Sequence, residues 1–422
     1  MDARRTIEAI FRIESPKLVA RLARMVRDVG TAEELAQEAM IAALAHWETE
    51  GVPDRPGAWL MATAKHRAID VLRRSARGDQ KLEALAHQLE QEQGTPDLDA
   101  AIDAEVGDDL LRLVLTACHP VLPSEARVAL TLRLLGGLTT AEIARAFLVP
   151  EPTIAQRIVR AKRLLREAEV PFEVPRGTAL SERLESVLEV IYLIFNEGYL
   201  ATAGQDWMRP ALADDALRLA RVLTALVPRE PEAHALLALL ELQASRARAR
   251  TDAEGAPILL LEQDRSRWDH AQIRRGLEAL GRCFSLGGAR GRYALEAAIA
   301  ACHARARRAE ETDWRTIAAL YTVLVEVRPS PVIELNRAVA IGMAFGPGPA
   351  LEVVDALVAE GSLARYHLLM SVRADLLLRL GRTREARVEL LRAIEHTDNV
   401  RERALLEARL QAISDSSAEP PR

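Results

Sequence analysis

Apolar positions recur every three or four residues along most of this chain, which is the period of an α-helix with one buried face. Residues 149–167 show the pattern in a simple form. On a helical wheel their apolar stripe consists of Ile154, Ile158, Ala161 and Leu165, and the opposite side consists of Gln156, Arg160 and Arg163. The pattern predicts an amphipathic helix that buries one side and exposes a basic one.

Similar segments follow one another from residue 179 onward, each ending at a proline or glycine. They are typical of antiparallel helix pairs. Near the end of the chain, small residues stand where two helices must approach closely. Three of these, Ala374, Gly381 and Ala386, occupy positions resembling the tetratricopeptide repeat, a helical hairpin that stacks into a solenoid. We therefore expect a helical-repeat domain, whereas the tail at 414–422 should be disordered.

Composition agrees with an all-α fold. Aromatic residues make up only 4% of the 422 residues, while Ala, Leu and Arg recur throughout, which favours helices over strands. The net charge of −5 argues against a uniformly basic surface but permits a local basic face. The three cysteines form no CxxC pair or disulfide framework, and no apolar run reaches membrane-spanning length, so we expect a cytoplasmic protein without a membrane partner.

The context of residues 149–167 indicates what the basic face does. Just upstream, "GGLTTAEIARAF" offers Thr139 and Glu142 at capping-box spacing and then a short helix ending near Phe147. A short helix, a tight turn and a second, Arg-rich helix predict a helix-turn-helix, in which the second helix enters the major groove of DNA.

The recognition helix supplies two kinds of contact. Near its start, the side chains expected to read bases or the adjoining backbone are Thr153, Gln156, Arg157 and Arg160. Further along, the side chains expected to bind phosphates are Lys162, Arg163 and Arg166. A solvated surface helix without a nucleic-acid partner is the alternative for this segment alone.

The segment "SEARVALTLRLLGGLTTAEIARAFLVPEPTIAQRIVRAKRLLR" resembles region 4 of bacterial sigma factors of the extracytoplasmic-function group, which reads the promoter minus-35 element. Upstream, "DVGTAEELAQEAMIAAL" and "RPGAWLMATAKHRAIDVLRR" resemble two helices of sigma region 2, the second of which melts and reads the minus-10 element. The resemblance covers roughly residues 5 to 168, in the order that the family has. It implies two partners, core RNA polymerase and promoter DNA.

In the first region 2 segment, Thr31 and Glu34 have the spacing of a capping box. The resemblance implies that Glu34, Gln37 and Glu38 share a polar face that docks on the largest polymerase subunit. A solvated acidic face is the alternative.

In the second region 2 segment, Leu60, Ala64, Ala68 and Val71 are expected to form the buried stripe. The residues expected to contact the DNA backbone are Lys65, His66, Arg67, Arg73 and Arg74. Trp59 either supports an unstacked base or packs in the core. Because His66 stands where the family commonly has Asn, the promoter sequence is not predicted.

The second half resembles that of a sigma subgroup with a tetratricopeptide-like extension, whose signature looks like "LIFNEGY" at residues 193–199. For that subgroup the extension is thought to regulate the sigma factor in cis. The candidates for an interdomain or ligand contact are therefore Phe195, Asn196, Glu197 and Tyr199. The alternative is an ordinary helix end, with Gly198 in the left-handed conformation and Tyr199 packed beneath it.

The expected organisation has six parts. They are sigma region 2 at 1–80, an acidic linker at 81–110, the region 4 helix-turn-helix at 111–170, a linker at 171–178, the helical-repeat extension at 179–413 and a tail at 414–422. The linker assignment rests on nine acidic residues and no Lys or Arg between Leu82 and Leu110, with helical signals resuming at Leu111.

The predicted function is that of a sigma subunit, with no enzyme activity, no cofactor and no metal, because the chain lacks GxxxxGK[ST], HExxH and GxSxG motifs. The alternative is an operator-binding helix-turn-helix regulator whose helical repeats act as a sensor or scaffold. A protein or ligand partner on the repeats fits either function.

Overall fold

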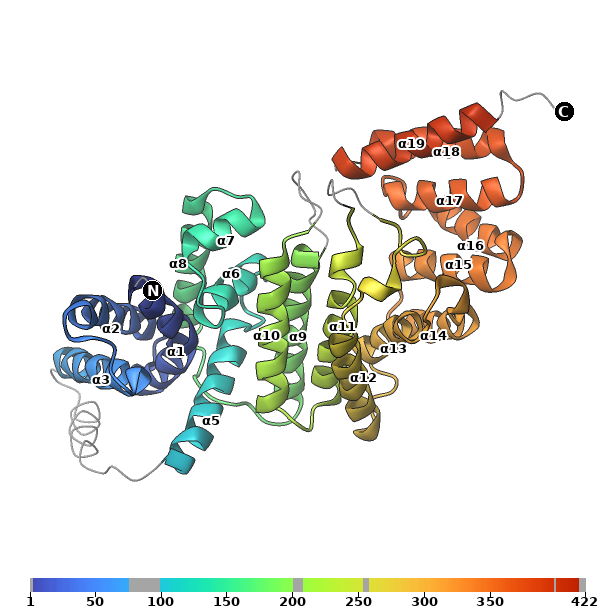
Figure 1. Ribbon diagram of the computed structural model, residues 1–422. Coiled ribbons are helices and arrows are strands. Elements are labelled where there is room, and N and C mark those ends of the chain that lie inside the picture. Colours follow the sequence, from blue (N-terminus) through green and yellow to red (C-terminus); the bar gives the residue numbers. More distant parts are fainter. Residues whose placement is uncertain (1–2, 76–98, 200–207, 253–257, 398–399, 417–422) are drawn as a thin grey trace. The chain divides into compact units, whose positions relative to one another are not determined.

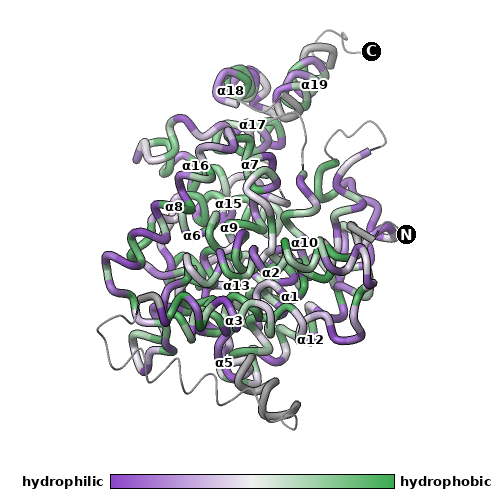
Figure 2. Tube along the Cα trace, turned by 90° about the vertical axis from the view of Figure 1, so that its left-hand side faces the viewer, coloured by the Kyte–Doolittle hydropathy of each residue, from purple (hydrophilic) through white to green (hydrophobic). Residues whose placement is uncertain are grey.

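The structure, a computed structural model, describes residues 3–75, 99–199, 208–252, 258–397 and 400–416. They form helices joined by loops, which confirms the all-α prediction (Figure 1). The chain divides into two compact units, residues 1–194 and 195–422. Figure 2 shows apolar and polar positions alternating along individual helices, the pattern expected when each helix buries one side.

The first unit begins with a helical bundle. Its helices are α1 (Ala3–Val26), α2 (Val29–Glu50), α3 (Pro56–Ser75) and α5 (Asp99–Ala117). The first three pack against one another, and α5 packs against α1. In α2 the buried residues include Leu35 and four alanines, Ala32, Ala36, Ala39 and Ala43, and the small alanine side chains permit close helix packing.

Three sequence expectations for this bundle are wrong in detail. Helix α5 begins at Asp99, before the expected start at Leu111, so a helix occupies the end of the expected acidic linker. The N-cap of α2 is Asp28, whose carboxylate accepts a hydrogen bond from the backbone N–H of Thr31 at 2.7 Å, and this replaces the expected capping box. In α3, Val71 is only half-buried, because Leu72 occupies the buried side in its place.

The rest of the first unit is a compact group of shorter helices. They are α6 (Ser124–Leu134), α7 (Thr140–Phe147) and α8 (Glu151–Glu167), followed by the first part of α9 (Thr178–Tyr199). Helices α6, α7 and α8 pack against one another. The start of α9 is attached to them: the hydroxyl of Ser186 donates to the carbonyl of Cys118 at 2.5 Å, and Arg127 on α6 lies 3.1 Å from Glu189.

The second unit is a succession of helices in which each packs against its neighbours in sequence. The α-helices are α10 (Pro210–Leu226), α11 (Pro231–Ala244), α12 (His270–Ser285), α13 (Arg292–Arg305), α14 (Trp314–Val327), α15 (Pro331–Phe345), α16 (Pro347–Glu360), α17 (His367–Arg379), α18 (Thr383–His396) and α19 (Val400–Ser416). The described part of the unit also contains the short 3-10 helices η2 (Ala247–Ala249), η3 (Arg265–Arg267) and η4 (Ala309–Glu311). This serial packing is that of a helical-repeat domain.

The expected helical hairpin near the end of the chain is present as α17 and α18. Ala374 and Ala386 are fully buried where the two helices meet, and Gly381 turns the chain between them with φ of +75°. Helix α19 continues to Ser416, so the first residues of the expected disordered tail are helical; the remainder of that tail lies outside the described residues.

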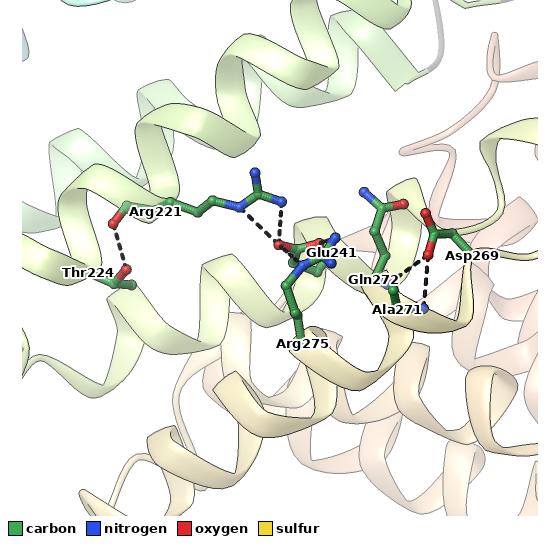
Figure 3. Close-up of polar contacts among 7 residues, drawn as sticks. All are labelled: Arg221, Thr224, Glu241, Asp269, Ala271, Gln272 and Arg275. Atoms are coloured by element: carbon green, nitrogen blue, oxygen red, sulfur yellow. Dashed lines mark hydrogen bonds and ion pairs between the residues drawn. The ribbon is translucent and has the colours of Figure 1, made fainter.

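A buried carboxylate joins three helices of the second unit (Figure 3). Glu241 on α11 is 1% exposed, and its carboxylate forms ion pairs with two arginines. Arg221 on α10 donates to it at 2.7 and 3.0 Å, and Arg275 on α12 donates at 3.2 Å from each of two nitrogens. The pairing of one buried anion with two guanidinium groups fixes the register of these helices.

Candidate nucleic-acid interface

Helices α7 and α8 form the predicted helix-turn-helix. Thr139 accepts from the backbone N–H of Glu142 at 3.1 Å, and the Glu142 carboxylate accepts from the backbone N–H of Thr139 at 2.7 Å, which is the expected capping box. The turn that follows α7 contains Leu148 in the left-handed conformation, with φ of 51°. This turn ends α7 and redirects the chain into α8.

Helix α8 buries the predicted stripe of Ile154, Ile158, Ala161 and Leu165. On its opposite side Gln156, Arg160 and Arg163 are exposed. Arg163 lies 3.4 Å from Glu167 one turn later, a weak surface pair. The exposed side of α8 therefore presents one amide and two guanidinium groups, the donors that bind base edges and phosphates.

The flanks of α8 are engaged within the protein. Half-buried Thr153 lies on one flank together with Arg157, whose guanidinium is 2.5 Å from Glu125 on α6. On the other flank, Lys162 lies 2.5 Å from Glu33 and Arg166 lies 3.0 Å from Asp28. The three predicted cationic DNA contacts on the flanks, Arg157, Lys162 and Arg166, are thus each paired with a carboxylate in this structure.

Glu33 on α2 is a site residue that the sequence reasoning missed. Its carboxylate is 5% exposed and also accepts from Arg133 on α6 at 2.6 Å. Burial by itself raises the pKa of Glu33, but the charges of Lys162 and Arg133 outweigh it and hold the pKa below its ordinary value of 4.5. The sequence feature that could have indicated its burial is its position one helical turn after Val29, in phase with the apolar stripe of α2.

The predicted minus-10 residues lie on α3. Trp59 is half-buried and stacks on His46 with ring centroids 5.6 Å apart, while its edge contacts Trp47 at 5.3 Å. Both alternatives for Trp59 therefore retain support, because the ring packs against α2 without being fully buried.

The basic residues of α3 differ in their surroundings. His66 and Arg73 are exposed, and Lys65 is half-buried. Arg67 donates to the carboxylate of Glu38 on α2 at 2.9 Å. Arg74 lies on α3, but its side chain is outside the described part of the structure.

The three residues of the predicted polymerase-docking face lie on α2. Glu34 is exposed, Glu38 is exposed and paired with Arg67, and Gln37 is half-buried and donates to Glu33 at 2.6 Å. Each is thus on or beside the solvent-facing side of α2, and the carboxylate of Glu34 is exposed to solvent.

The "LIFNEGY" residues of the second unit are placed at the end of α9. Phe195 is 1% exposed and stacks on Tyr199 with ring centroids 5.3 Å apart. Glu197 is paired with Arg209, and Asn196 is exposed.

The expected left-handed conformation of Gly198 is wrong. This glycine is helical, and an added Cβ would lie 2.4 Å from the backbone nitrogen of Ala213 on α10. The position thus requires glycine because two backbones approach closely there.

Comparison with known families agrees with this arrangement. The family described as Sigma-70 region 2 matches residues 10–78, and the family described as Sigma-70, region 4 matches residues 112–165. A family of unknown function, DUF6596, matches residues 183–284. The fold and the matched regions define a DNA-binding transcription-initiation protein of the sigma-70 class.

Relatives specify the group within that class. "ECF RNA polymerase sigma factor SigL" of Mycobacterium tuberculosis is 33% identical over 34% of this chain and 77% of its own, and "ECF RNA polymerase sigma factor SigK" of Mycobacterium ulcerans is 32% identical over 34% of this chain and 75% of its own. The chain belongs to the extracytoplasmic-function (ECF) RNA polymerase sigma factors.

A longer relative covers the second unit as well. "Uncharacterized protein R00370" of Rhizobium meliloti is 42% identical over 96% of this chain and 94% of its own. Among solved structures, the TPR domain of P58(IPK) aligns with 95% of this chain and 99% of its own at 12% identity and a TM-score of 0.28. Among the described residues, no helix is both long and apolar enough to cross a bilayer.

Proposed function

We propose that this sigma factor binds core RNA polymerase through α2, opens the minus-10 element with α3, anchors at the minus-35 element with α8 and is regulated in cis by its helical extension. The observation that carries the proposal is the open side of α8. Gln156, Arg160 and Arg163 are exposed there on a helix whose opposite stripe is fixed in the core. This is the arrangement that a recognition helix needs to enter the major groove.

The proposed DNA contacts fall into two sets. Gln156 and Arg160 are the proposed base readers, and Arg163 is the proposed phosphate contact. Arg157 and Lys162 join them when their carboxylate partners release them. In region 2, Trp59 and the basic side chains of α3 are proposed to hold the melted strand by stacking and charge.

Docking on polymerase is assigned to Glu34, Gln37 and Glu38. Support comes from the open carboxylate of Glu34 and from the position of all three on one helix. Glu38 also contacts Arg67 of the minus-10 helix, so docking at α2 would act directly on α3.

Regulation in cis is proposed to act through α9. This helix is held to region 4 by Ser186 and Glu189, and it continues without interruption into the "LIFNEGY" residues of the second unit. A change in the extension that shifts α9 would therefore act on α6 through Arg127.

The first experiment is co-elution of the full chain with core RNA polymerase on a sizing column. We expect wild-type protein to co-elute and a variant with Glu34→Ala, Gln37→Ala and Glu38→Ala to elute separately while retaining the helical circular-dichroism spectrum of the wild type. If wild-type protein binds operator DNA but does not bind polymerase, the function is that of an operator-binding regulator and not that of a sigma subunit.

A second experiment tests regulation in cis. The variant Arg127→Gln should change the yield of promoter-dependent transcription in vitro without changing the affinity for core polymerase. The matched control is Glu182→Gln, on an exposed position of α9. Equal transcription by wild type and Arg127→Gln would overturn the proposed route through α9.

A further inference from the structure

A row of alternating guanidinium groups and aromatic rings runs through the second unit beside the end of α9. The hydroxyl of Tyr199 accepts from Arg246 at 2.8 Å, and the guanidinium carbon of Arg246 lies 5.9 Å from the ring centroids of both Tyr199 and Trp268. Arg265 lies over the Trp268 ring at 5.0 Å. Cation–π contacts thus connect these four side chains in series.

The inner end of the row is buried. Arg265 is 7% exposed, Trp268 is 4% exposed and His303, at the end of α13, is 9% exposed. Arg246 and Tyr199 are half-buried, so the row reaches solvent at its outer end. The row therefore leads from the surface into the interior of the unit.

Neither guanidinium of the row meets a carboxylate among the described residues. Arg265 donates to the carbonyls of His303 and Ala306 at 2.8 and 2.9 Å and to the hydroxyl of Thr312 at 2.9 Å. Arg246 donates to the hydroxyl of Tyr199 and to the side-chain carbonyl of Gln243. The hydrogen-bond partners of both cations are thus neutral groups, which is costly for the buried Arg265.

Arg265 and Trp268 of the row, together with Gln263 and His303, each have a buried polar atom without a hydrogen-bond partner among the described residues. These atoms are Nε of Arg265, Nε1 of Trp268, Oε1 of Gln263 and Nδ1 of His303. Buried polar atoms in proteins are nearly always paired. The arginine and indole nitrogens are N–H donors, so what they lack is an acceptor.

The pKa values of His303 and Arg265 reflect their burial beside other cations. Burial, and then the charges of Arg246 and Arg265, lower the pKa of His303 to about 4. Burial and the charge of Arg246 also lower the pKa of Arg265, and the charges of Glu310 and Glu311 only partly oppose this. His303 is therefore neutral at neutral pH, and the positive charge of the cluster belongs to Arg246 and Arg265.

We propose that Arg246, Arg265 and Trp268 form a binding site for a small oxyanion, a carboxylate or a phosphate. Guanidinium groups bind the oxygen pairs of both anions, and the indole N–H adds a third donor. The anion enters at the half-buried end beside Tyr199, the last residue of the "LIFNEGY" segment. This inference does not rest on the proposed function, because the site lies within the extension and needs neither polymerase nor promoter.

The test follows the melting temperature of the full chain with increasing potassium phosphate or potassium malonate, each against potassium chloride at equal ionic strength. We expect a saturable rise with at least one of the two anions, because a ligand of the native state stabilises it. The anion that binds more tightly identifies the class, phosphate or carboxylate. The variant Arg246→Gln should weaken the apparent affinity about tenfold or more, because a charge-assisted hydrogen bond is lost.

The control variant is Arg274→Gln, an exposed arginine of α12, which should respond as wild type does. An equal rise of the melting temperature in chloride would overturn the site. So would an equal rise in Arg246→Gln and wild type, since general salt effects do not depend on one side chain. If Arg246→Gln does not fold, Trp268→Phe serves in its place. It keeps an aromatic ring and removes the N–H donor, so unchanged affinity in that variant would also overturn the site.

Discussion

The carboxylate of Glu33 on α2 lies 2.5 Å from the ammonium group of Lys162 on α8. A region 2 helix thus holds the recognition helix of region 4 through a buried anion, which also accepts from Arg133 on α6. While this pair is formed, the Lys162 charge is neutralised, whereas Arg160 and Arg163 are exposed on the open side of the recognition helix.

Glu33→Gln is expected to lower the free energy of unfolding by about 3 kcal/mol at pH 7, because it leaves two cations facing a neutral group in a buried place. The measurement is urea unfolding of the full chain. The matched control is Glu34→Gln, the exposed neighbour, which should change the stability by less than about 0.5 kcal/mol.

The difference in stability between wild type and Glu33→Gln should depend on pH. The pKa of Glu33 in the folded protein lies below 4.5, so its ionised form stabilises the fold at pH values above 4.5. This contribution disappears as the pH falls through the lowered folded value. The stabilities of wild type and Glu33→Gln should therefore converge in acid; a constant gap between them would contradict the role given to the charge.

Arg160→Gln should weaken binding to promoter DNA about tenfold and make the slope of log affinity against log salt shallower by about one. Lys162→Gln should have a smaller effect, because Glu33 already neutralises that charge. Fluorescence anisotropy with a labelled promoter fragment, at several salt concentrations, measures both. A larger loss for Lys162→Gln would indicate that the pair with Glu33 opens when DNA binds.

Glu241→Gln is expected to destabilise the second unit by about 3 kcal/mol, since the buried carboxylate serves both Arg221 and Arg275. Thermal unfolding followed by circular dichroism checks this. Glu278→Gln, at an exposed position of α12, is the control. Equal melting temperatures for the two variants would show that Glu241 contributes little.

Gly198→Ala should destabilise the protein by about 1–3 kcal/mol, because the new methyl group would meet the α10 backbone at Ala213. Gly281→Ala provides the contrast, since an added Cβ there meets nothing within 4 Å, and alanine favours the helix by about 0.5–1 kcal/mol. The two variants should thus shift the urea midpoint in opposite directions. A shift of both in the same direction would contradict the close approach at Gly198.

Local periodicity in the sequence determined the helices and the side of each that is buried. It predicted the stripe of α8, the Thr139–Glu142 capping box and the hairpin of α17 and α18, because all depend on residues close together in the chain. The sigma resemblance likewise rested on contiguous segments, and the matching families confirm it.

Tertiary structure alone decided which charged residues meet. Glu33 and Lys162 are 129 positions apart, as their numbers show, and each belongs to a helix with several charges of the same kind, so no local pattern selects this pair. The same holds for Gly198, whose role is set by the approach of α10, and for Arg246, which meets Trp268 and Arg265 although they belong to another segment, at η3. Sequence periodicity fixes the inward side of a helix, but the partner across the contact depends on how whole helices pack.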